Sequence, residues 1–117
     1  MKKQMIQTIF IISGLLLSFS VLLAHQPTTI KMNYDLPSQS LSVWVGYYTA
    51  VHYSDYVKEI EVKVNGKTSQ SYSYKSQYDS HGTVTHIYKV EAKPGDVIEV
   101  TATSTTNESR TESLIVK

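Results

Sequence analysis

Apolar and polar residues alternate one by one along most of the chain after residue 25, and no segment there shows a helical period. The alternation is clear in residues 29–34, 41–47, 59–64 and 97–103. Because successive side chains of a β-strand point to opposite faces, this period of two predicts strands that each bury one face.

Turn-forming residues separate the alternating segments. Asn65-Gly66 directly follows one of them and predicts a type I′ hairpin, since Asn and Gly tolerate the positive φ angles of that turn. The returning segment is polar, so we expect an edge strand with Tyr72 and Tyr74 facing inward. The predicted strands are residues 29–34, 41–47, 59–64, 67–74, 84–92, 97–103 and 113–116.

The number and spacing of these strands predict an all-β fold, an immunoglobulin-like antiparallel β-sandwich of about seven strands. No linker or internal repeat interrupts the pattern, so residues 25–117 are expected to form one domain. The chain contains no cysteine. The disulfide-bonded core of antibody domains is therefore excluded.

The first 24 residues have the pattern of a signal peptide. Lys2 and Lys3 precede a largely apolar run, residues 6–24, which ends on Ala24 before a polar segment. The alternative is an uncleaved N-terminal anchor that meets the membrane through residues 6–24, because about 20 apolar residues can span a bilayer. Both interpretations predict an exported domain that is periplasmic, on the cell surface or extracellular.

The charge balance argues against a nucleic-acid partner. The formal net charge is +1, and removal of Lys2 and Lys3 would change it to −1. Lys and Arg are not clustered in the remaining chain, whereas binding to phosphate backbones needs clustered Lys and Arg. No nucleophile elbow or phosphate-binding glycine loop occurs either, so hydrolase or nucleotide chemistry has no support.

Two stretches, "HY…YVKEIEVKVNGK" and "YKVEAKPGDVIEVTATSTTNESRTESLIV", resemble the iron-binding domain of superoxide reductases, the neelaredoxin and desulfoferrodoxin family. The resemblance covers roughly residues 41–116 and is clearest over residues 56–66 and 93–104. These are mainly strand and turn residues. The resemblance therefore implies the β-sandwich fold more strongly than it implies the chemistry.

In that family a ferrous ion is held by four equatorial histidines and an axial cysteine thiolate, and superoxide is reduced at the open sixth position. The resemblance places a histidine ligand near Tyr47 or Tyr48 and another at Asp55. It places the cysteine at Ser104 and the last histidine at Asn107. Alcohol, amide and phenol groups are poor replacements for imidazole and thiolate, so we expect the iron centre to be lost.

This expectation favours a binding or structural module over an enzyme. A superoxide-reductase-type iron oxidoreductase with altered ligands is the alternative, and His52, in the ligand-bearing loop, is a candidate ligand for it. A second alternative is a Cu(II)-binding module. If the signal peptide is cleaved, His25 becomes the N-terminus and offers an amine and an imidazole to copper, and His52, His81 or His86 would complete the site.

Tyrosines are concentrated in the middle of the chain, especially in residues 47–56. Exposed tyrosines offer rigid contact area, so this loop is the candidate surface for a protein or surface partner. Some of these rings are expected to lie in the core instead, above all Tyr47 and Tyr74. His86 shares its strand face with Tyr88 and is expected to be a half-buried structural histidine.

Overall fold

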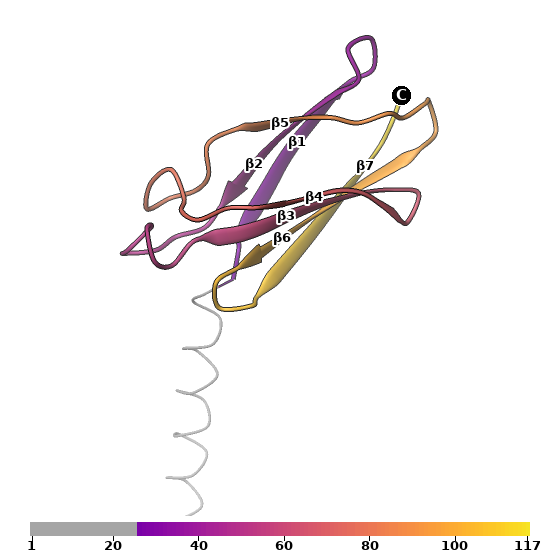
Figure 1. Cartoon of the computed structure of the whole chain (residues 1–117). Coiled ribbons are helices and arrows are strands. Elements are labelled where there is room, and N and C mark those ends of the chain that lie inside the picture. Colours follow the sequence, from indigo (N-terminus) through magenta and orange to yellow (C-terminus); the bar gives the residue numbers. More distant parts are fainter. Residues whose placement is uncertain (1–25) are drawn as a thin grey trace, which may run out of the picture.

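The computed structural model describes residues 26–117. The predicted signal peptide and His25 lie outside these residues. Among residues 26–117, no helix has the length and apolar character needed to cross a bilayer. Figure 1 shows the strands, which are β1 (Thr29–Asp35), β2 (Ser40–Gly46), β3 (Val57–Val64), β4 (Lys67–Ser73), β5 (His86–Lys89), β6 (Val97–Ser104) and β7 (Ser109–Ile115).

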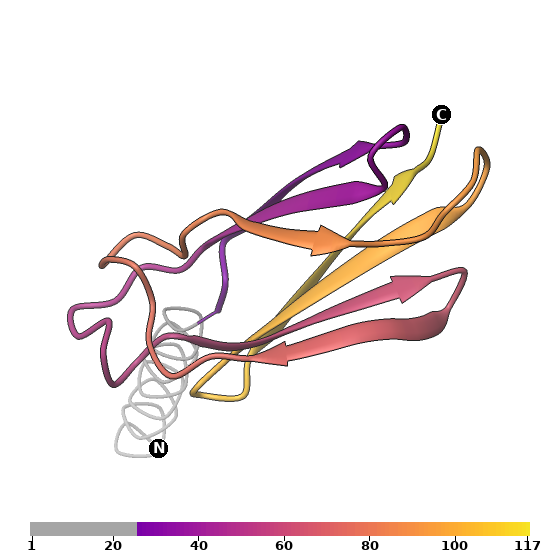
Figure 2. The ribbon, with the colours of Figure 1, turned by 45° about the horizontal axis from the view of Figure 1, so that its top comes forward.

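The strands form two antiparallel sheets, one of order β1-β2-β5 and one of order β4-β3-β6-β7. The two layers face each other across the core, as Figure 2 shows. This arrangement confirms the predicted all-β sandwich of seven strands. It also confirms that the segment after the Asn-Gly turn, β4, lies at a sheet edge.

The core is built from the inward-facing positions of the alternating strands. Every second residue of β2 and of β6 is buried, as the sequence pattern predicts. The hairpin between β3 and β4 turns at Asn65 and Gly66, whose φ angles of 52° and 81° are those of a type I′ turn. The core residues without measurable exposure are Leu41, Val43, Val45, Tyr47, Ile60, Val62, Val90, Ile98, Val100 and Ala102.

The predicted and observed strands differ most at β5 and β7. β5 spans only His86–Lys89, within the predicted 84–92 strand. β7 begins at Ser109, four residues earlier than expected. The inward-facing positions of β7 include Arg110 and Glu112, which form an ion pair of 3.3 Å. Because charged residues occupy these inward positions, apolar and polar residues do not alternate at the start of this strand, and the sequence pattern does not predict it.

An aromatic cluster closes one side of the sandwich between the edge strands β4 and β5. The Tyr74 and Tyr88 hydroxyls lie 2.6 Å apart. Tyr72 stacks on Tyr88 at 4.6 Å between ring centroids, and Tyr74 lies 4.3 Å from His86. Burial raises the pKa of Tyr74 and of Tyr88. Tyr74 is half-buried, whereas Tyr72, also expected to face inward, remains 38% exposed.

His86 makes the stability of this cluster depend on pH. Burial lowers the pKa of His86, so the unfolded chain binds a proton more readily than the folded one. The contribution of neutral His86 to the free energy of unfolding is therefore complete above about pH 6.5, the usual histidine pKa, and it decreases as the pH falls below that value. We expect the melting temperature to fall between about pH 7.5 and 5.5, and to fall less in His86→Gln. If the melting temperature of the parent chain and that of His86→Gln fell equally with pH, His86 would not be the cause of the pH dependence.

Gly82 has no room for a side chain. It forms an isolated bridge with Gly46, and a Cβ atom on Gly82 would lie 2.6 Å from both the Trp44 ring and the Val45 carbonyl oxygen. We expect Gly82→Ala to lower the free energy of unfolding by about 2 kcal/mol through overpacking. Gly46→Ala is the matched control, because the nearest atom there, Thr28 Oγ1, is 3.0 Å away. Urea unfolding should show a smaller loss for Gly46→Ala.

Candidate functional site

The loop between β2 and β3 carries a carboxylate that accepts three hydroxyl hydrogen bonds. Asp55 Oδ1 accepts from the Tyr47 hydroxyl at 2.7 Å and from Thr105 Oγ1 at 2.9 Å. Asp55 Oδ2 accepts from Thr49 Oγ1 at 3.2 Å. Thr105 follows β6, about fifty residues along the chain, so this carboxylate joins two distant segments. We call Asp55 and its hydroxyl partners the Asp55 network.

The Asp55 network extends into the turn after β6. The Tyr47 side chain is fully buried, and its pKa is raised by burial first and by the hydrogen bond to Asp55 second. Hydrogen bonding to Ser104 and Thr106 acts in the opposite direction on the same hydroxyl. Ser104 Oγ and Thr106 Oγ1 lie 2.7 Å apart. The site is thus a set of interlinked hydroxyls around one carboxylate.

Gln77 is also hydrogen-bonded to this loop. Its side chain is only 5% exposed. Oε1 accepts from the Val57 amide at 3.2 Å, and Nε2 donates to the carbonyls of Tyr47 and Asp79, both at 2.8 Å. Its own amide donates to the His52 carbonyl at 3.1 Å. Gln77 therefore fixes the segment between β4 and β5 against the loop that holds Asp55.

Sequence reasoning missed Gln77. The segment 75–82 has no alternating pattern, and a glutamine between serine and tyrosine resembles any exposed loop residue. Its burial follows from its position between two loops, which no local pattern records. Thr105 was missed for the same reason, since its role depends on Asp55 lying beside the turn after β6.

Two of the residues singled out from the sequence have partners outside the Asp55 network. Tyr48 is 62% exposed, and its ring meets His81 edge-on at 5.6 Å. His52 Nδ1 lies 3.1 Å from the Gln77 carbonyl oxygen.

The other positions at which the resemblance implies metal ligands are Asp55, Ser104 and Asn107. Asp55 and Ser104 come together, and the residue between them is Tyr47. Asn107 lies on the exposed turn and accepts a hydrogen bond from the Lys58 ammonium group. Across residues 26–117, no three side chains of the His, Cys, Asp and Glu types are grouped so that they could hold a metal ion.

The end of the sandwich that carries this site exposes three tyrosines. The loops 47–56 and 74–85 extend side by side from the same end of the molecule (Figures 1 and 2). Tyr48, Tyr53 and Tyr78 on these loops are 62%, 71% and 72% exposed. Gln77, which precedes Tyr78, donates hydrogen bonds to the carbonyls of Tyr47 and His52, so the two loops that carry the exposed rings are hydrogen-bonded to each other.

Comparison with known proteins relates the fold to solved structures. No protein-family model matches the chain, and no curated protein sequence matches it significantly. The superoxide reductase (neelaredoxin) from Ignicoccus hospitalis superposes with a TM-score of 0.52 and 14% identity, over 78% of this chain and 80% of that chain. A second structure of that superoxide reductase gives a TM-score of 0.49 and 16% identity, over 85% and 84% of the two chains.

At this level of identity the similarity concerns the fold and not the chemistry. It agrees with the resemblance that the strand and turn residues suggested. The described part of the chain has the β-sandwich fold of the neelaredoxin superoxide reductase.

Proposed function

We propose that this chain is a binding module that uses the superoxide reductase sandwich without its iron chemistry. The observation that carries the proposal is the bonding of Asp55. This residue stands where the resemblance implies a histidine ligand, and its carboxylate accepts hydrogen bonds from Tyr47, Thr49 and Thr105. An acceptor with three donors already directed at it is committed to holding two loops together.

The donor groups present do not fit the ferrous site that the resemblance implies. Ser104 replaces the thiolate with an alcohol that pairs with Thr106, and an alcohol does not donate electron density to iron as a thiolate does. Asn107 replaces an imidazole with an amide whose oxygen accepts from the Lys58 ammonium group. A neighbouring positive charge further opposes binding of a cation.

The binding role would belong to the tyrosine-bearing end of the molecule. Tyr48, Tyr53 and Tyr78 supply large exposed surfaces with few rotatable bonds, which lowers the entropy lost on contact. The hydrogen bonds of Gln77 hold the loops in place before a partner arrives, and such preorganisation favours affinity. A protein or surface partner outside the cytoplasm is consistent with the signal-like pattern of residues 1–24.

Metal analysis of the full chain, purified from its native host, tests the proposal. We expect iron well below one ion per chain, and superoxide consumption no faster than with the heat-denatured protein. An authentic superoxide reductase prepared in parallel is the positive control. One tightly held ferrous ion per chain with catalytic superoxide reduction would refute the proposal. Stoichiometric Cu(II) that is lost in His25→Ala would favour the copper-binding alternative.

A further inference from the structure

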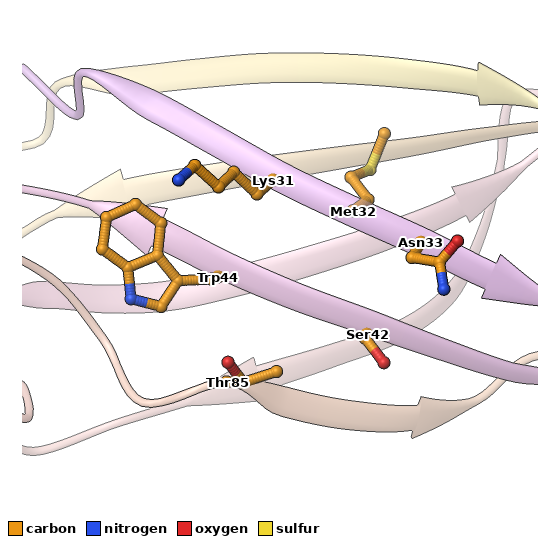
Figure 3. Close-up of a pocket in the computed structure, with 6 residues that line it drawn as sticks. All are labelled: Lys31, Met32, Asn33, Ser42, Trp44 and Thr85. Atoms are coloured by element: carbon orange, nitrogen blue, oxygen red, sulfur yellow. The ribbon is translucent and has the colours of Figure 1, made fainter.

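The outer face of the β1-β2-β5 sheet carries an indole ring that lies against glycines. Trp44 points away from the core, in alternation with the buried Val43 and Val45. A Cβ atom added to Gly46 would come within 3.3 Å of the Trp44 ring, and one added to Gly82 would come within 2.6 Å. Only glycine lets the ring lie this close to the backbone. Figure 3 shows the indole on the outer face of the sheet.

Polar side chains surround this ring in register. Lys31 lies directly opposite Trp44 across the β1–β2 pair, and Asn33 lies opposite Ser42. The Lys31 ammonium group is 5.1 Å from the indole centroid. Together with Thr85, these residues line a shallow groove of about 450 Å³, whose side chains are labelled in Figure 3. The groove combines an apolar floor with hydroxyl, amide and ammonium groups at its rim.

A second depression continues the groove toward the tyrosine-bearing end of the molecule. It measures about 270 Å³ and shares Trp44 and Thr85 with the first. Its other lining residues include Tyr78 and Asp79. The two depressions meet at Trp44, so the trough is elongated and is suited to a chain-like ligand more than to a compact one.

These features match the chemistry of a sugar ring. A pyranose presents an apolar C–H face, which packs on a flat aromatic surface, and a rim of hydroxyls, which need hydrogen-bond partners. Lys31 has no ion pair with any of the residues 26–117, so a carboxylate on the sugar would complement its charge. We infer that the Trp44 groove binds an acidic saccharide chain, with one ring on Trp44 and a carboxylate at Lys31.

Other ligand classes fit the groove less well. An apolar peptide would cover Asn33, Ser42 and Thr85 without supplying partners for their polar groups, and unpaired buried groups are costly. A nucleic acid would need several cations for its phosphates, whereas Lys31 is the one Lys or Arg among the residues that line the two depressions. The inference rests on the proposal that the chain binds rather than catalyses.

The chain contains a single tryptophan, so its intrinsic fluorescence reports on Trp44 alone. We would titrate the full chain with an oligogalacturonate and, in parallel, with a neutral cello-oligosaccharide of equal length, each up to about 10 mM. A saturable change in emission with the acidic oligosaccharide, weaker with the neutral one, is expected. No saturable change with either would overturn the inference.

Lys31→Gln is the discriminating variant, because it keeps the stem and removes the charge. We expect it to weaken oligogalacturonate binding roughly three- to fivefold, the upper part of the range for an exposed ion pair, and to leave the neutral oligosaccharide unaffected. Lys89→Gln is the matched control, since Lys89 lies outside the groove, and it should bind like the parent chain. If the parent chain and Lys31→Gln bound the oligogalacturonate with equal affinity, the inference that the saccharide is acidic would be overturned.

A Trp44→Leu variant, followed by calorimetry because it lacks the fluorophore, should lose binding while keeping a cooperative thermal transition. Retained binding in this variant would place the ligand elsewhere and overturn the inference. The superoxide and iron assays remain independent of these titrations. If the titrations showed no binding and the chain held no iron, saccharide binding would be refuted, whereas the proposal that the chain is a binding module would remain.

Discussion

Replacing Gln77 with alanine is expected to lower the free energy of unfolding by about 3 to 4 kcal/mol, the largest effect of any change proposed for this site. The variant removes the acceptor of the Val57 amide and the donor to the Tyr47 carbonyl, both buried. Each buried polar group that loses its partner costs about 1–3 kcal/mol. Urea unfolding monitored by circular dichroism measures the loss.

Gln70→Ala is the matched control for this change. Gln70 Nε2 also donates to a backbone carbonyl, that of Lys89, but at an exposed position where water can replace it. We expect Gln70→Ala to change the free energy of unfolding by less than about 1 kcal/mol. Similar losses for the two variants would mean that Gln77 does not clamp the loops.

Replacing Asp55 with alanine is expected to lower the free energy of unfolding by about 3 kcal/mol and to leave the iron content unchanged. The buried Tyr47 hydroxyl and the Thr105 hydroxyl would lose their acceptor. Thr49 would lose its acceptor too, which would loosen the loop that presents Tyr48. Thermal and urea unfolding give the stability, and metal analysis gives the iron content.

Two controls separate a structural from a metal-binding role of Asp55. Asp55→Asn keeps an oxygen acceptor, so it should cost less than Asp55→Ala. Asp35→Ala removes an exposed carboxylate that accepts a hydrogen bond from the Ser38 amide, and it should have little effect on the free energy of unfolding. A loss of bound iron in Asp55→Ala, with stability unchanged, would show that the carboxylate is a metal ligand.

The strands that the sequence predicted well are those whose inward-facing residues are apolar. β2 and β6 bury every second residue, and that period is visible in the sequence itself. The hairpin at Asn65 and Gly66 was also predictable, because the positive φ angles depend on those two residues alone. β7 began earlier than predicted since its inward positions include Arg110 and Glu112.

The candidate site was predictable only in part. The resemblance directed attention to Asp55 and Ser104, and the structure brings both to the same network around Tyr47. It did not indicate that Thr105 would bond to Asp55, because these residues lie fifty positions apart. Gln77 gave no signal at all, although its side chain forms three hydrogen bonds.

The sequence by itself determined the all-β class, the strand order along the chain, the Asn-Gly hairpin and the absence of cysteine chemistry. These properties depend on side-chain period and local φ preferences, which each segment carries within itself. Only the tertiary structure decided which hydroxyls meet Asp55, that Gln77 is buried, and that Trp44 lies on Gly46 and Gly82. The contacts of Asp55 with Thr105, of Gln77 with Tyr47 and of Trp44 with Gly82 join segments that are distant in sequence, so they arise only once the two sheets have packed and fixed the paths of the loops.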